Sequence, residues 1–324
     1  MTDASIRRVS DQEDGRTATL GRRPTGKEAA RIKVDLAVPA YVHPLIDPDV
    51  WERLATVARH LRFVIVNVDS GPGALLDPAY PPVIEQLRAS RARLVGYVDT
   101  DYGRRSVEDV VADARLWVLR YGVRGVFFDQ VAGDFEHLEY YAACALGARA
   151  CGAQYVVLNP GADCHPGYAD IANVTVTFEG TWTEYADHEP PRWTLGMPAS
   201  RFCHLVYDVP ADRIAAGPAK AAGRHAGTAF FTGGGGANPW DQLPAAVVDA
   251  VRRAHPGAVT PSVGTPSWGG RSYAEAPADS SRAPADSSRE GPPPVAQRTP
   301  APVRAGRPLL WRRTAVPDPA SGKS

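Results

Sequence analysis

Eight short apolar runs, each about as long as a β-strand, follow one another through the middle of the chain. They are rich in β-branched and aliphatic residues and show little polar alternation, which is typical of strands buried on both faces of a parallel sheet. The runs occupy 34–41, 63–69, 93–100, 125–130, 155–161, 174–180, 202–209 and 227–233.

Segments with helical periodicity separate most of these runs. Asp47 and Ser106 stand where N-caps are expected, and Gly122 stands where a C-terminal cap is expected. The connections 162–173 and 181–201 are exceptions, because the first is short and the second is rich in Trp and Pro with only a weak helical pattern. Helices are predicted over 47–61, 78–90, 106–122, 134–152, 210–225 and 241–254.

The alternation of strands and helices over about 220 residues predicts an α/β fold, a single (β/α)8 TIM-type barrel. No GxGxxG follows the first run, which argues against a dinucleotide fold, and the glycines at 233–236 lack the Lys and Ser/Thr of a P-loop. We expect the barrel to occupy 31–256. Disordered tails are expected at 1–30 and 257–324, since both ends are polar and the second carries a tandem APADSSR copy.

The composition limits the partners of the chain. There are 36 Lys and Arg against 36 Asp and Glu, so no net charge attracts nucleic acid or an acidic membrane surface. No apolar run approaches the roughly 18 residues of a membrane span. We therefore expect no nucleic-acid partner and no membrane association. The N-terminal stretch lacks the apolar core of a secretory signal, which predicts a cytoplasmic location and leaves secretion by another route open.

Metal and disulfide chemistry find little support in the sequence. The four cysteines lack CxxC pairs and are too few for a disulfide framework, so we expect buried, reduced thiols. Asp163, Cys164, His165 and His204 show no recognised ligand spacing. No metal site and no cofactor are expected.

Polar residues gather at the carboxyl ends of the predicted strands, where the functional groups of a barrel lie. On the run 174–180, the two valines and Phe178 alternate with two threonines and Glu179. The apolar set belongs against the helices, so Glu179 ends an inward-facing row at the barrel mouth. The same count brings further residues to the mouth: Tyr41, Asn67, Asp69, Tyr97, Asp99, Asp129 and Asn159, with either His204 and Asp208 or Tyr207 on the seventh run.

Two carboxylates on a rigid rim, with aromatic residues on nearby loops, suggest glycoside hydrolysis. One carboxyl group protonates the leaving oxygen, and the other acts as a nucleophile or activates water. Trp182, Tyr185 and Trp240 are the loop aromatics that could contact sugar rings. Each of these residues taken alone is explained equally well as a strand-end cap or a packing residue, so the functional hypothesis depends on their convergence.

Five ordered motifs also resemble those of the spherulation-specific family 4, or spherulin 4-like, proteins. The resemblance covers 34–250 and implies a β/α barrel similar to glycosidases that cut α-1,4-linked galactosamine polymers. It therefore implies an oligosaccharide or polysaccharide as the partner. The motifs are NVDSGPG (67–73), GYVDTDYGRR (96–105), GVFFDQ (125–130), LNPG (158–161) and TFEG (177–180).

By position, the resemblance implies Asp129 and Glu179 as the catalytic pair, in an order that the sequence leaves open. Strand-end position, loop position and the resemblance together give the predicted substrate-binding residues. These are Tyr41, Asn67, Asp69, Tyr97, Asp99, Tyr102, Gln130, Asn159, Trp182, His204 and Tyr207.

The chain departs from the family pattern at two motifs. Gln130 stands where the family has a second acidic residue, and Val68 and Asp69 replace the usual residues of the SGPG turn. An amide at position 130 cannot exchange a catalytic proton. Two hypotheses follow: a glycoside hydrolase acting on an amino-sugar glycan, or a carbohydrate-binding barrel that has lost turnover. Unrelated hydrolase or lyase chemistry on the same scaffold is a third, because fold does not fix function.

Overall fold

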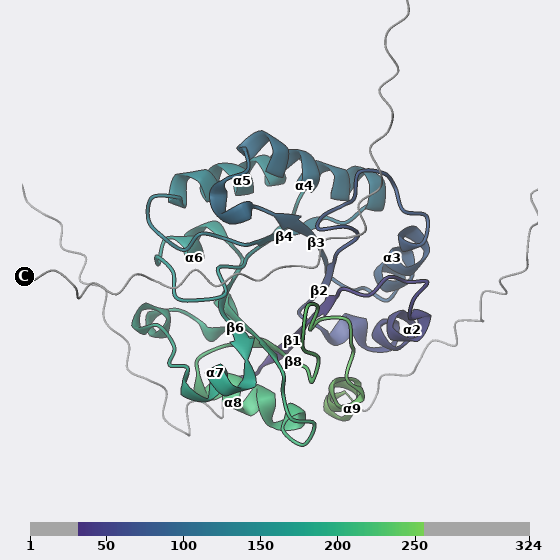
Figure 1. Cartoon of the computed structure of the whole chain (residues 1–324), viewed down its shortest axis with the longest axis vertical. Coiled ribbons are helices and arrows are strands. Elements are labelled where there is room, and N and C mark those ends of the chain that lie inside the picture. Colours follow the sequence, from purple (N-terminus) through teal and green to yellow (C-terminus); the bar gives the residue numbers. More distant parts are fainter. Residues whose placement is uncertain (1–31, 256–324) are drawn as a thin grey trace, which may run out of the picture. The chain divides into compact units, whose positions relative to one another are not determined.

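The computed structural model describes residues 32–255, and the predicted tails at 1–30 and 257–324 lie outside the described residues. Eight parallel strands pair in sequence order, and the last pairs with the first to close a barrel. Figure 1 looks into this ring of strands, with the helices arranged outside it. The predicted (β/α)8 barrel is confirmed. The strands are β1 (Asp35–Ala40), β2 (Phe63–Val66), β3 (Leu94–Asp99), β4 (Gly125–Asp129), β5 (Tyr155–Leu158), β6 (Val174–Thr181), β7 (Phe202–Tyr207) and β8 (Thr228–Phe231).

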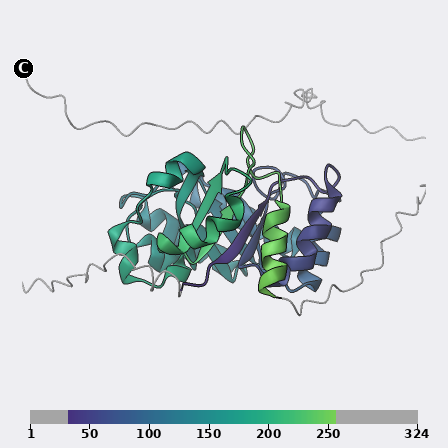
Figure 2. The same cartoon turned by 90° about the horizontal axis from the view of Figure 1, so that it is seen from below.

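The helices cover the outer face of the strands. In Figure 2 the last helix, α9, lies beside α2, and the Arg252 guanidinium on α9 donates to Thr56 Oγ1 on α2 at 3.3 Å. The helices are α2 (Pro48–Val57), α3 (Tyr80–Ala89), α4 (Val107–Tyr121), α5 (Leu138–Ala150), α6 (Tyr168–Ile171), α7 (Trp182–Asp187), α8 (Gly217–Gly223) and α9 (Ala245–Ala254). Short 3₁₀ turns occupy Ala58–His60, Asp101–Gly103, Arg192–Gly196, Ala199–Arg201 and Ile214–Ala216. Within 32–255, no helix combines the length and apolarity needed to cross a bilayer.

Local sequence signals begin and end the helices as predicted. Asp47 Oδ1 accepts from the Val50 amide at 3.1 Å at the start of α2, and Ser106 Oγ accepts from the Asp109 amide at 3.1 Å at the start of α4. Each side chain satisfies a backbone donor that has no partner within its helix. Gly122 ends α4 with a left-handed φ of 65°, which glycine adopts without a side-chain clash.

The predicted element ends differ from the structure at several places. Four predicted runs extend two or three residues past the ends of their strands, because the residues there form the turns of the barrel mouth: those of β2, β5, β7 and β8. The segment 181–201, predicted to be only weakly helical, begins with α7. Thr181 Oγ1 accepts from the Glu184 amide, and the Glu184 carboxylate accepts from the Thr181 amide, so a capping box nucleates this helix.

A tryptophan fixes β3 against α4 and so positions one wall of the site. The Trp117 ring lies directly against the backbone of Gly96, where any side chain would collide with it. The Trp117 indole nitrogen donates to the Tyr97 carbonyl at 2.7 Å. Trp117 and Tyr97 are both buried, so this contact holds the strand that carries Tyr97 and Asp99 to the mouth.

Candidate active site

Two carboxylates meet at the carboxyl ends of β4 and β6, and a single amide joins them. Asn159, directly after β5, donates through Nδ2 to Asp129 Oδ1 and to Glu179 Oε2, each at 2.6 Å. These two oxygens are therefore at most twice 2.6 Å apart. Asn159 Oδ1 is buried and has no hydrogen-bond partner among the described residues. We refer to Asp129 and Glu179 as the carboxylate pair.

The LNPG turn carries the bridge. The backbone amide of Asn159 donates to the Phe128 carbonyl at 2.9 Å, and the backbone amide of Glu179 donates to the Gly161 carbonyl at 2.8 Å. Gly161 has a left-handed φ of 65°, and a Cβ there would lie 3.2 Å from the Glu179 Cβ. Glycine is favoured at this position because both its left-handed backbone and the close approach of Glu179 disfavour a side chain.

Burial raises the pKa of both members of the carboxylate pair. Three donors act against burial at Asp129: the Tyr97 hydroxyl, Asn159 Nδ2 and the Gln130 amide. At Glu179 the charge of Asp129 raises the pKa further, and only Asn159 acts against it. Two close carboxylates in a buried site cannot both carry full charge. The pair therefore favours a state with one shared proton, and the donors at Asp129 favour the negative charge on that residue.

Four tyrosines face the carboxylate pair. Burial raises the pKa of Tyr41, Tyr97, Tyr102 and Tyr207, and the nearby carboxylate charges raise each one further. The hydroxyls therefore stay protonated and can donate hydrogen bonds. The Tyr97 hydroxyl is buried without a partner of ordinary hydrogen-bond geometry among residues 32–255, although it is near enough to Asp129 to lower the pKa of that carboxyl. The structure thus places all four predicted tyrosines around the pair.

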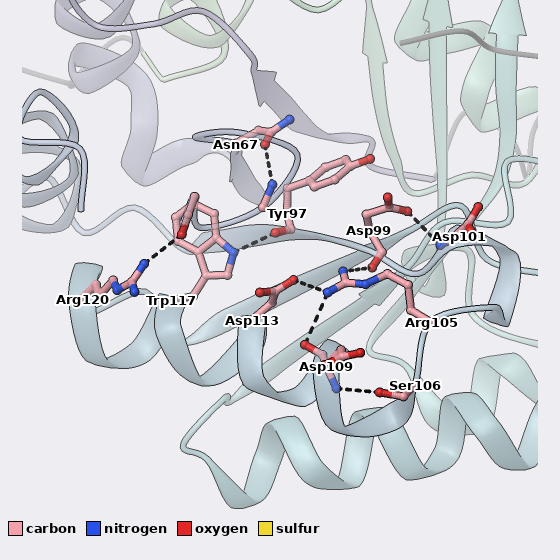
Figure 3. A network of polar contacts seen from close by, with 12 residues as sticks. Asn67, Tyr97, Asp99, Asp101, Arg105, Ser106, Asp109, Asp113, Trp117 and Arg120 are labelled. Atoms are coloured by element: carbon pink, nitrogen blue, oxygen red, sulfur yellow. Dashed lines mark hydrogen bonds and ion pairs between the residues drawn. The ribbon is translucent and has the colours of Figure 1, made fainter. Parts of the chain in front are cut away.

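The end of β3 is fixed by a polar network that Figure 3 displays. Asp99 lies opposite Asp129 in the strand register, and its Oδ1 accepts from the Asp101 amide at 2.8 Å. Arg105 donates to the Asp99 carbonyl at 2.5 Å and to Asp113 Oδ2 at 2.7 Å. Burial raises the pKa of Asp99, and the Asp101 amide and Arg105 act against that rise. Sequence reasoning missed Arg105 and Asp113, although the GRR of the second motif contains the arginine.

Thr100 is a third residue that sequence reasoning missed. It is fully buried, and its Oγ1 lies 2.8 Å from the Asp129 carbonyl, 2.9 Å from the Gln130 carbonyl and 3.0 Å from the Tyr141 hydroxyl. The Gln130 carbonyl also accepts from the Tyr102 amide at 2.8 Å. Gln130 and Tyr102 both have left-handed backbones, with φ of 53° and 54°. These hydrogen bonds hold Gln130 and Tyr102, two residues with strained backbones, beside the carboxylate pair.

Asn67 and Asp69 form the turn after β2 and do not contact the carboxylate pair. Asn67 Oδ1 accepts from the Gly71 amide at 3.0 Å, and the Asn67 carbonyl accepts from the Tyr80 hydroxyl at 3.0 Å. Asp69 is exposed and forms an isolated bridge with Pro72. Figure 3 shows the Asn67 contact apart from the Asp99 and Arg105 network, with Tyr97 between them. Both residues lie on the rim, and their observed contacts close the turn.

His204 and Trp182 lie against helices and not beside the carboxylate pair. The His204 ring is buried, its Nδ1 lies 2.9 Å from the Tyr185 hydroxyl, and burial lowers its pKa. On β7 the inward residue is therefore Tyr207, the other of the two predicted alternatives. The Trp182 ring packs against Phe231 on β8, with Lys220 Nζ 5.2 Å from its centroid.

The described part of the chain holds no group of three or more His, Cys, Asp or Glu side chains that could bind a metal ion. All four cysteines are free thiols, and Cys144, Cys164 and Cys203 are buried. The chemistry available at the mouth is therefore that of paired carboxylates surrounded by tyrosine hydroxyls.

Comparisons with known proteins agree with the motifs. Aspergillus clavatus Sph3, solved in complex with GalNAc, superposes with a TM-score of 0.60 at 27% identity, covering 68% of this chain and 97% of Sph3. Spherulin-4 of Physarum polycephalum is 32% identical over 151 residues, which is 45% of each protein, so the match spans less than half of that relative. The profile of spherulation-specific family 4 matches residues 35–253, from β1 into α9. The resemblance is confirmed, and the chain belongs to spherulation-specific family 4.

Proposed function

We propose that this protein is a glycoside hydrolase that acts on an amino-sugar glycan of the galactosamine type. One observation carries the proposal: a single amide nitrogen holds the buried Asp129 carboxylate and the half-buried Glu179 carboxylate together at the mouth of a barrel. A protonated carboxylic acid beside an ionised carboxylate is the combination that cleaves glycosidic bonds.

The environments of the two carboxyl groups assign their roles. Glu179 holds the shared proton and acts as the general acid, because the Asp129 charge raises its pKa and it accepts only the Asn159 hydrogen bond. Asp129 keeps its charge, because three donors stabilise the carboxylate. Oxygens no more than twice 2.6 Å apart fit the about 5–5.5 Å separation of retaining enzymes better than the roughly 6.5–9.5 Å of inverting ones.

The reaction then has two steps. Glu179 gives its proton to the glycosidic oxygen as that bond breaks, and Asp129 bonds to the anomeric carbon. Glu179, now ionised, removes a proton from water, and the resulting hydroxide displaces Asp129 from the anomeric carbon. The first step leaves Glu179 ionised and Asp129 esterified, and the second returns the Glu179 carboxylic acid and the Asp129 carboxylate, so the pair is restored after turnover.

The surroundings of the pair support an amino sugar. Tyr102, which is 41% exposed, presents an aromatic ring at the mouth, and Sph3 was solved with GalNAc. Loops that follow the strands are rich in acidic residues, which favour a sugar that carries an ammonium group. These acids are Asp69, Asp77, Asp101, Asp134, Asp163, Asp208 and Asp241.

Turnover of partially deacetylated α-1,4-galactosamine oligomers tests the proposal. Glu179→Gln and Asp129→Asn should each lower kcat at least about a hundredfold, with thermal unfolding still cooperative. Asp249→Asn is the matched control, since this carboxylate is exposed on α9, outside the barrel mouth. Proton NMR of the first product should give the anomer of the substrate. Near-normal turnover by either variant would overturn the assignment.

Carbohydrate binding without turnover is the second candidate, and Gln130 favours it. An amide stands directly beside Asp129, where the family motif has a carboxylate. Wild-type protein that binds galactosamine oligomers and never cleaves them would establish this candidate. The carboxylate pair is complete without a carboxylate at position 130, which favours the hydrolase.

A further inference from the structure

A pocket lies at the amino end of the barrel, on the opposite side from the carboxylate pair. Its volume is about 540 Å³, and it is formed by the turns that lead into β3, β4 and β5. Four arginines line it: Arg88, Arg91, Arg93 and Arg124. These turns belong to the face of a barrel that does not carry the catalytic groups, so the pocket is separate from the proposed hydrolase site.

Most of the positive charge of this pocket is uncompensated. Arg88 pairs with Glu85 at 3.1 Å, and this pair is exposed on α3. Across residues 32–255, no carboxylate forms an ion pair with Arg91, Arg93 or Arg124. Guanidinium groups stay charged at every physiological pH. Three exposed positive charges therefore line one concave surface, and no anion among the described residues neutralises them.

An aromatic ring holds one of these guanidinium groups in place. The Arg93 guanidinium carbon lies 4.5 Å from the centroid of the Tyr155 ring, and Arg93 Nη1 donates to the Arg62 carbonyl at 3.2 Å. Gly125, the first residue of β4, lies between β3 and β5, and a Cβ there would come within 2.5 Å of the Leu94 carbonyl. Fixing a guanidinium before binding reduces the side-chain entropy lost when a ligand arrives.

The pocket also has an apolar lining. The Tyr155 ring and Ala92 both line it and are partly exposed. The Tyr155 hydroxyl is buried away from solvent and has no hydrogen-bond partner in the described part of the chain. The pocket therefore offers both charge and a surface for an organic group.

We propose that this pocket binds a phosphate-bearing small molecule. The guanidinium fork matches the oxygens of a phosphate, which carries enough negative charge to offset several arginines. A volume of about 540 Å³ falls within the range of small-molecule sites and exceeds what one phosphate ion fills. The organic part of the ligand lies against Ala92 and the Tyr155 ring while its phosphate meets the arginines. This inference does not depend on the hydrolase proposal.

Calorimetric titration of the full chain tests the inference with three probes in 0.15 M NaCl. Inorganic phosphate and glucose 6-phosphate should bind one per chain and compete with each other, and glucose should not bind. Tighter binding of the ester would identify a phosphomonoester as the occupant, and tighter binding of inorganic phosphate would identify the free ion. Absence of binding by both phosphates at 10 mM would overturn the inference.

Paired variants locate the site. Arg91→Gln with Arg124→Gln removes two charges without touching the Arg93 stack and should weaken phosphate binding about a hundredfold, or about tenfold per guanidinium. Arg53→Gln with Arg115→Gln removes two charges from exposed helix positions and should leave binding unchanged. Equal weakening of phosphate binding by both double variants, or no weakening by either, would refute the assignment of the phosphate site to this pocket. The unfolding temperature of each ligand-free variant shows that the fold is intact.

Discussion

The bridging amide of Asn159 should control the protonation of both carboxylates, and Asn159→Leu is the change that tests this. Leucine is nearly isosteric with asparagine and has no donor. Each member of the carboxylate pair would lose one hydrogen bond of 2.6 Å. Because these bonds stabilise the ionised forms, the pKa of Asp129 and that of Glu179 should both rise.

The size of the shift follows from the energy of a charged hydrogen bond. Such a bond contributes about 1.5–3 kcal/mol, and one pKa unit corresponds to about 1.4 kcal/mol, so each pKa should rise by about one to two units. Asp129 keeps the Tyr97 and Gln130 donors, whereas no other donor lowers the pKa of Glu179. The larger rise is therefore expected at Glu179.

The pH dependence of kcat/KM measures both shifts. The acidic limb reports ionisation of the base, and the basic limb reports loss of the acid's proton, so the whole profile should move to higher pH. Asn67→Ala is the control, because its amide closes a turn on the same rim and does not contact the pair. Carboxyl ¹³C NMR titration gives the same pKa values without turnover. Limbs that stay in place, or that move to lower pH, would refute the role of the bridge.

Four further substitutions test the pair and its surroundings. The pKa of Glu179 is raised in the folded state, so its contribution to stability is present below the unfolded pKa and is lost as pH rises through the raised value. Glu179→Gln should therefore raise the unfolding temperature by a few degrees at pH 9 and leave it unchanged at pH 4. Gln130→Glu adds a carboxylate next to Asp129 and should move the acidic limb to higher pH; an unmoved limb would show that the side chain lies outside the site. Trp182→Ala should lower the unfolding temperature with little effect on KM, whereas Tyr207→Phe should raise KM with little effect on the unfolding temperature. A fall in affinity confined to Trp182→Ala would show that the Trp182 ring contacts the sugar.

Alternation along β6 was enough to predict that Glu179 faces the mouth. Phe178, predicted to face the helices, contacts Tyr185 with ring centroids 4.8 Å apart, and Glu179 accepts from Asn159 on the other side. The alternation succeeds because each side chain of a barrel strand meets either the interior or the helices. A register irregularity between Val176 and Phe178 against β7 leaves no sign in the sequence, because it depends on how the neighbouring strand pairs.

The bridge itself could not be predicted from the sequence. Asn159 reaches both carboxylates because β4, β5 and β6 pair with one particular stagger, and stagger is set by packing over the whole barrel. Trp182 was predicted at the sugar site from its residue type and its loop. The Thr181–Glu184 capping box instead begins α7 there, and the ring packs outside β8.

The balanced charge of the chain conceals two faces of opposite sign. Loops after the strands carry acids such as Asp134 and Asp163, whereas turns before them carry arginines such as Arg91 and Arg124. The 36 positive and 36 negative side chains cancel only in the sum. Within about 10 Å, the screening distance at ordinary ionic strength, a ligand responds to one face alone. The two proposed sites therefore select ligands of opposite charge, although the net charge predicts attraction for neither.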